Sequence, residues 1–211
     1  MKKITAIMLV ILSTVAIVEA QTLKKVPQEQ KDIIVRSIAG NISAVKSIQC
    51  DFRQEKSVSL LNDKVVSKGR MYFSDGNLRW EYLTPYSYVF LVNGEDVVVK
   101  SDDKTTKMDS RSGQLYKRIA QLMANTISGS NLVQNNDFNV EVYENGSKYV
   151  AKLVPVQARM KKMFSEISLY FNNNQNIVEK IVIAEASGDK TTIEILNAKT
   201  NVKVPDSVFK P

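Results

Sequence analysis

The sequence predicts a mainly β protein of the α+β class, in which about ten antiparallel strands curl into a barrel or a half-barrel. Three observations support this prediction. Apolar and polar residues alternate with a period of two over many short segments, turn signals separate these segments, and two stretches follow a helical period instead. In a half-barrel, the two helices would cover the open side of the sheet.

The N-terminal segment has the layout of a secretory signal peptide. The pair Lys2-Lys3 precedes an apolar run from Ile4 to Val18, and Val18-Glu19-Ala20 is a small-x-small cleavage pattern. This run is shorter than the ~20 residues that a membrane span needs. We therefore expect residues 1–20 to be a cleaved signal peptide of a bacterial protein. Residues 21–211 should form a single domain in the periplasm, without a lipid anchor because no cysteine follows the cleavage pattern.

Two residue counts restrict the chemistry of the chain. It contains no histidine and only one cysteine, Cys50. The lack of histidine excludes Ser-His-Asp and Cys-His mechanisms and histidine metal sites. Cys50 alternates with Ile48 and Phe52, which predicts a buried thiol in a strand. Two-carboxylate chemistry stays possible, but the acidic residues are scattered, so we expect neither a catalytic site nor a metal or cofactor.

The chain is basic, with a formal charge of +7 that falls to +6 when residues 1–20 are removed. Such a charge suits contact with anionic headgroups or an acidic partner. The lysines are spread along the chain and no nucleic-acid-binding motif is present. We therefore expect no nucleic-acid partner.

Two segments are predicted to be helices. The first begins at Pro27-Gln28-Glu29 and runs to about Ser47, because proline is tolerated in a first turn and apolar residues then recur at helical spacing. The second lies between Ser112 and Ser128 and ends before Gly129. Its apolar stripe consists of Leu115, Ile119, Leu122 and Met123.

The remaining segments are predicted to be strands joined by tight turns such as Asp75-Gly76, Asn93-Gly94 and Asn145-Gly146. The expected strands are Ile48–Phe52, Val65–Phe73, Leu78–Tyr82, Tyr86–Val92, Val97–Val99, Thr105–Met108, Asn139–Tyr143, Tyr149–Val154, Ile167–Phe171, Ile177–Ala184 and Thr191–Asn197. The polar segment from Pro155 to Phe164 is expected to hold a helical turn.

Two stretches resemble the LolA-type outer-membrane lipoprotein carriers. The first contains Gly69-Arg-Met-Tyr-Phe, the strand Leu78-Arg-Trp-Glu-Tyr82 and Pro85. The second contains Ser187-Gly188-Asp189, Thr191-Thr-Ile193 and the C-terminal residues Asn197, Asn201, Val204 and Phe209. The order of helices and strands along the whole mature chain is similar to that of the family.

This resemblance implies an incomplete barrel with a strongly curved sheet, an N-terminal helix and a central lid helix. It also implies a periplasmic carrier that takes lipoprotein acyl chains from an inner-membrane ABC-type release complex to an outer-membrane acceptor. We expect such a carrier to be a monomer. A lipid- or lipoprotein-sensing domain on the same fold, without transfer activity, is the alternative.

The turn before the Leu78–Tyr82 strand departs from the family pattern. Many members carry a basic residue followed by proline there, whereas this chain has Ser74-Asp75-Gly76. If the basic residue latches the lid in those members, this chain lacks that latch or builds it elsewhere.

The candidate binding residues are the apolar members of the alternating strands and the apolar stripe of the second helix. The candidate cavity wall consists of Phe52, Met71, Phe73, Leu78, Trp80, Tyr82 and Phe90, and the candidate lid of Leu115, Ile119, Leu122 and Met123. An ordinary apolar core would produce the same alternation. The family resemblance favours a cavity for the group as a whole.

Overall fold

The computed structural model describes residues 23–60, 63–94, 96–101, 104–108, 138–171 and 177–210. The helices are α1 (Gln28–Ser43), α3 (Ala158–Lys161) and the 3-10 helix η2 (Asp206–Phe209). The strands are β1 (Lys24–Lys25), β2 (Ser47–Val58), β3 (Asp63–Ser74), β4 (Asn77–Thr84), β5 (Tyr88–Asn93), β6 (Asp96–Ser101), β7 (Lys104–Lys107), β8 (Phe138–Asn145), β9 (Lys148–Pro155), β10 (Phe164–Phe171), β11 (Val178–Glu185) and β12 (Lys190–Thr200).

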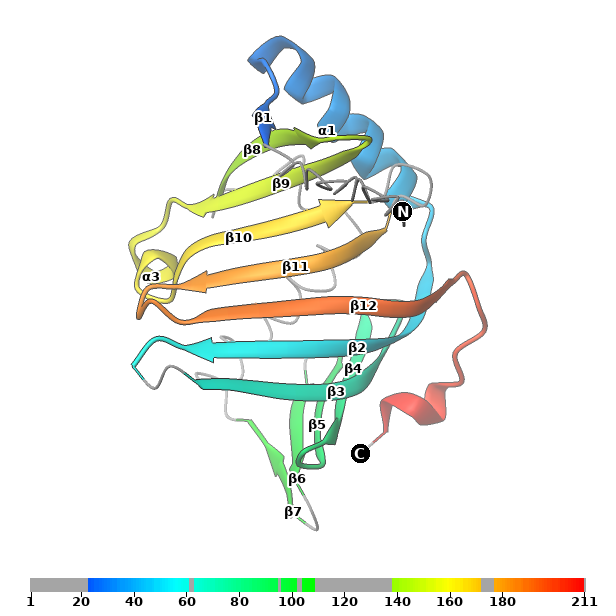
Figure 1. Cartoon of the computed structure of the whole chain (residues 1–211). Helices are drawn as coiled ribbons and strands as arrows, with labels where there is room; N and C mark the ends of the chain where they lie inside the picture. Colours follow the sequence, from blue (N-terminus) through cyan, green and yellow to red (C-terminus); the bar gives the residue numbers. More distant parts are fainter. Residues whose placement is uncertain are drawn as a thin grey trace, which may run out of the picture.

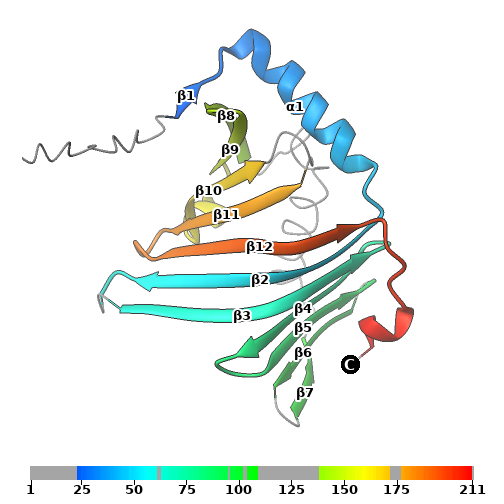
Figure 2. The same ribbon diagram turned by 45° about the vertical axis from the view of Figure 1, so that its right-hand side comes forward.

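The strands form a single curved sheet. Its order is β1-β8-β9-β10-β11-β12-β2-β3-β4-β5-β6-β7, and every neighbouring pair is antiparallel. Within the described residues β1 and β7 are the two ends of this order and do not pair with each other, so the sheet is bent without closing (Figures 1 and 2). The half-barrel form of the prediction is therefore confirmed, with twelve strands in place of about ten.

Helix α1 links the two halves of the sheet. It leads from β1, at one end of the strand order, to β2 in the middle, and lies on the open side of the curve (Figure 2). Val35 and Ile38 on its inner side are 7% exposed and join the apolar core. The helix ends at Ser43 rather than near the predicted Ser47, because Ser47 already pairs with Ser74 in the sheet.

The two faces of the sheet differ in chemistry. The concave face is apolar, and its residues form one packed cluster that extends from Val142 on β8 to Leu78 on β4. The convex face carries ion pairs between neighbouring strands, such as Arg53 with Glu194 at 3.6 Å. Exposed pairs of this kind contribute at most about 1 kcal/mol each, so burial of the concave face is the main stabilising contribution.

Local signals placed the turns and most strands correctly. Asp75 and Gly76 have φ values of 50° and 80°, which is the geometry of the predicted tight turn. The helical turn expected between Pro155 and Phe164 is α3. The sequence analysis predicts no strand before the first helix, whereas Lys24–Lys25 form the edge strand β1, paired with β8.

None of the helices in the described ranges is both long and apolar enough to cross a membrane.

Candidate functional site

The seven predicted wall residues lie on four neighbouring strands and point to the same face. Residues opposite each other in an antiparallel pair share a face. Met71 is opposite Trp80, Trp80 is opposite Phe90, and Phe73 is opposite Leu78. Phe52 and Tyr82 are both opposite Gly69, one from β2 and one from β4. The register therefore brings all seven side chains together on the concave side of β2 to β5.

An aromatic cluster forms the centre of this group. The ring of Phe52 stacks on Trp80 at a centroid distance of 4.2 Å and meets Tyr82 edge-on at 5.2 Å. Gly69 makes this possible, because a Cβ atom at that position would overlap the Phe52 ring and the carbonyl oxygen of Glu81. The glycine of the first family-like stretch thus has a packing role: it leaves room for an aromatic ring above the backbone.

The group divides into two levels of burial. Phe52, Met71, Leu78 and Trp80 are at most 4% exposed, whereas Phe73, Tyr82 and Phe90 are only partly buried. The buried members form a floor, and the partly buried members border it. The predicted lid residues Leu115, Ile119, Leu122 and Met123 lie outside the described residues, and the lid stays a prediction.

Sequence reasoning missed a large part of this face. Strands β9 to β12 contribute Leu153, Leu169, Ile181 and Ile193, all at most 4% exposed and packed in the same cluster. Their alternation was recognised when these strands were predicted. What the sequence does not contain is the pairing of β12 with β2, which joins the two halves of the chain into one surface. No local signal marks a pairing between such distant segments.

Cys50 lies on the concave face opposite Met71 and is 3% exposed. Burial raises the pKa of its thiol to about 12, with a smaller contribution from the nearby Asp51 carboxylate. A thiol that keeps its proton is a poor nucleophile. The prediction of a buried thiol in a strand is confirmed.

Polar groups appear on the same face toward the far end of β2. The Tyr82 hydroxyl donates to Oε1 of Gln54 at 2.9 Å, and burial raises the pKa of Tyr82. Further along, Nζ of Lys56 lies 2.9 Å from Glu185 and 3.7 Å from Asp189. The hydrogen bond to Glu185 raises the pKa of Lys56 despite its partial burial. The concave face therefore has an apolar region and a polar end.

Arg79 does not belong to the concave face. It alternates with Leu78 and Trp80, so its side chain is on the convex side, where it pairs with Glu81 at 3.1 Å. It also donates to the carbonyl oxygen of Val208 in η2. Arg79 therefore faces away from the concave side, and its contact with Val208 holds the C-terminal segment.

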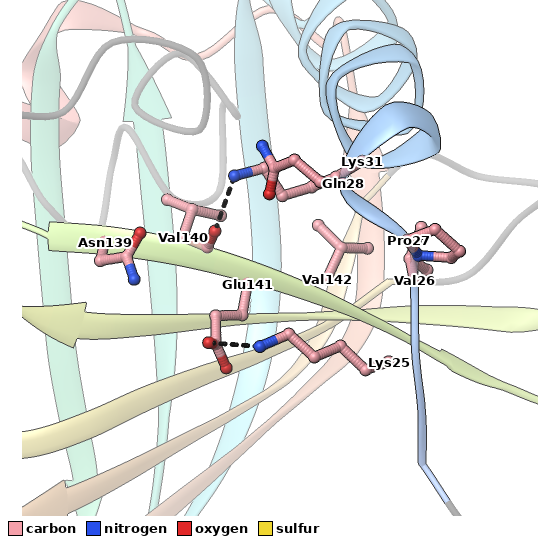
Figure 3. Close-up of a pocket in the computed structure, with 9 residues that line it drawn as sticks. All are labelled: Lys25, Val26, Pro27, Gln28, Lys31, Asn139, Val140, Glu141 and Val142. Atoms are coloured by element: carbon pink, nitrogen blue, oxygen red, sulfur yellow. Dashed lines mark hydrogen bonds and ion pairs between the residues drawn. The ribbon is translucent and has the colours of Figure 1, made fainter.

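A small pocket of about 370 Å³ lies at the β8 end of the sheet, between β1, the start of α1 and β8 (Figure 3). Its two lysines are already engaged: Lys25 pairs with Glu141 at 2.7 Å, and Lys31 donates to the carbonyl oxygen of Val140 at 3.3 Å. These contacts fasten α1 and β1 to the edge of the sheet. We assign the pocket a structural role.

The bent, open sheet with one apolar face is a half-barrel. A family model described as outer membrane lipoprotein carrier protein LolA matches residues 43–211. The chain belongs to this LolA family. No protein of curated function matches it in sequence.

Several solved structures are similar to this chain. Lipoprotein LppX of Mycobacterium tuberculosis is 12% identical with a TM-score of 0.50, and the match covers 85% of this chain and 99% of that one. A LolA superfamily protein of Nitrosomonas europaea is 12% identical with a TM-score of 0.45, covering 84% and 97%. MucB in its complex with MucA from Pseudomonas aeruginosa is 11% identical with a TM-score of 0.47, covering 86% and 61%. At these identities the likeness concerns the fold alone.

Proposed function

We propose that this protein is a periplasmic carrier that binds lipoprotein acyl chains on its concave face and moves them from the inner to the outer membrane. The observation that carries the proposal is the continuous apolar face of an open, bent sheet in a chain of the LolA family. The same reading includes a cleaved signal peptide over residues 1–20 and a protein without catalytic activity.

The physical chemistry of the face suits such a cargo. Each acyl CH₂ group that leaves water contributes about 0.8 kcal/mol, so long chains bind without polar recognition. Release is the harder requirement, and it needs walls that can adapt. Met71 at the centre of the floor is a flexible, polarizable side chain that suits this need.

The proposed route has two membrane partners. Cargo would come from an inner-membrane ABC-type release complex, and an outer-membrane acceptor would receive it. A monomer with one open face can meet these two partners in turn.

A release assay tests the proposal. Inner-membrane vesicles with a labelled lipoprotein and the release complex are mixed with the mature protein, and soluble lipoprotein is measured after sedimentation. We expect release in the presence of the protein. Absence of release together with absence of lipid binding contradicts the carrier function, whereas lipid binding without release or transfer favours the sensing alternative.

Two consecutive residues of β3 offer a matched pair of variants for this assay. Phe73 is on the concave face and Tyr72 on the convex face, and both are partly buried. Phe73→Glu should abolish most of the release because it places a charge where acyl chains lie, and Tyr72→Glu should leave it within about twofold of wild type. Met71 and Leu78 are less suitable for a charge, because at 0% and 1% exposure it would threaten the fold.

A further inference from the structure

The concave side of β2 changes character along its length. Ile48, Cys50 and Phe52 are at most 3% exposed and lie in the apolar cluster. The next two residues on the same face are Gln54 and Lys56, which are polar and only partly buried. Successive residues on one face of a strand are about 7 Å apart. The concave side of β2 therefore changes from apolar at Phe52 to charged at Lys56 over two such steps.

Three uncharged hydrogen-bonding side chains mark this boundary. The Tyr82 hydroxyl donates to Gln54, and the indole of Trp80 packs against Phe52 beside them. Nε1 of Trp80 is buried and makes no hydrogen bond within the part of the chain that the structure describes. A buried donor in this state is unfavourable, and an acceptor oxygen on a bound ligand would satisfy it.

The charged side chains just beyond the boundary determine which kind of ligand oxygen can bind there. Lys56 is shared between Glu185 and Asp189, at 2.9 and 3.7 Å, and Thr191 donates to Glu185 at 3.4 Å. One ammonium group thus faces two carboxylates, which leaves this cluster with one net negative charge. A free carboxylate placed at the boundary would be repelled, whereas an ester or amide carbonyl would not.

We infer that Gln54, Trp80 and Tyr82 form a subsite for the ester or amide carbonyl through which an acyl chain is attached. The chain lies along the partly buried Phe73 and Phe90 on the same face, and the attached polar part of the cargo extends over Lys56. The site therefore accepts esterified or amidated acyl chains and discriminates against free fatty acids. This inference rests on the proposed function, because it specifies how the carrier recognises the carbonyl group at the attached end of the acyl chain.

Two probes of equal chain length test it: methyl palmitate, which has an ester, and palmitate, which has a free carboxylate. Each displaces a fluorescent lipid from the delipidated mature protein at pH 7.5. We expect Trp80→Phe to weaken methyl palmitate about 3- to 10-fold, through loss of the donor to the carbonyl oxygen. Tyr82→Phe should weaken it by a similar factor, because the Tyr82 hydroxyl holds the Gln54 side chain whose amide N–H donates to the carbonyl. Tyr170→Phe, on the convex face beside Lys180, is the matched control and should change neither affinity.

The variant Glu185→Gln tests whether the acidic cluster disfavours the free carboxylate of palmitate. Removal of one carboxylate should tighten palmitate about 3- to 10-fold and change methyl palmitate less than twofold. The inference is overturned if Tyr82→Phe and Trp80→Phe both bind methyl palmitate as wild type does, or if Glu185→Gln alters the two probes equally. In those cases the carrier function stands, since both probes still bind. If neither probe binds the wild-type protein, the proposed function fails and this inference fails with it.

Discussion

Gly69 shows how a single residue sets the geometry of the binding face. It lies between Phe52 and Tyr82 in the sheet and leaves room for the Phe52 ring. From the sequence this glycine is recognisable only as part of a family-like stretch. Its packing role depends on the register between β2 and β3, which places Phe52 opposite it.

Gly69→Ala should destabilise the protein by about 1–3 kcal/mol, since the new methyl group overlaps the Glu81 carbonyl oxygen and the Phe52 ring. Urea unfolding followed by Trp80 fluorescence measures the effect. Gly40→Ala is the control: nothing lies within 4 Å of its added Cβ, and alanine in a helix should add up to about 1 kcal/mol. Equal stabilities for the two variants would contradict the packing role of Gly69.

Cys50 gives a prediction about reactivity. Its thiol has a pKa raised to about 12, against about 8.5 for a free thiol. At pH 8 the native protein should react with iodoacetamide on the order of a thousandfold more slowly than the urea-unfolded chain. Because the unfolded state loses this proton first, the contribution of Cys50 to stability should fall as the pH rises above about 8.5. Equal alkylation rates in both states would refute the assignment.

At the scale of elements, the C-terminal helix η2 packs on the convex face of β4 and β5. Phe209 is 4% exposed, and the backbone of η2 accepts hydrogen bonds from Arg79 on β4 and, at 3.4 Å, from Asn93 at the end of β5. Leu91, on the same side of β5, is 1% exposed. The terminal phenylalanine of the family-like stretch therefore packs away from the cavity.

Phe209→Ala should lower the free energy of unfolding by about 3 kcal/mol through loss of this packing. Ser207→Ala, at an exposed position of the same helix, should change it by less than about 0.5 kcal/mol. Lipid affinity, measured at a temperature at which both variants are folded, should be unchanged because η2 is on the other side of the sheet. Weaker lipid binding by folded Phe209→Ala would contradict the separation of the two faces.

The helices, strands and turns that could be predicted from the sequence are those marked by a pattern of neighbouring residues. Period-two alternation and the turns at Asp75-Gly76 and Asn93-Gly94 predicted the hairpins of β3 to β6. β1 was missed because a two-residue strand has no alternation and is held only by backbone hydrogen bonds to β8. The partnership of Gln54 and Tyr82, and that of Lys56 and Glu185, depends on strand pairing, so the polar end of the face could not be predicted from the sequence.

At the scale of the whole molecule, the protein separates two chemistries onto the two sides of one sheet. The convex side carries ion pairs such as Lys152 with Glu166 at 3.2 Å, and the concave side carries the apolar cluster. The sheet stays open between β1 and β7 in the described part of the chain. This separation of chemistries is the feature on which the proposed binding of acyl chains depends.

Native mass spectrometry of the protein, purified without detergent from the cells that produce it, tests this central claim most directly. The account predicts a fraction of molecules with added mass that corresponds to an acylated species, and Phe73→Glu should lose this mass while Tyr72→Glu keeps it. Extraction of the wild-type sample should yield ester- or amide-linked acyl chains. A wild-type protein that carries no acylated ligand, and gains none when incubated with lipoprotein, would contradict the account.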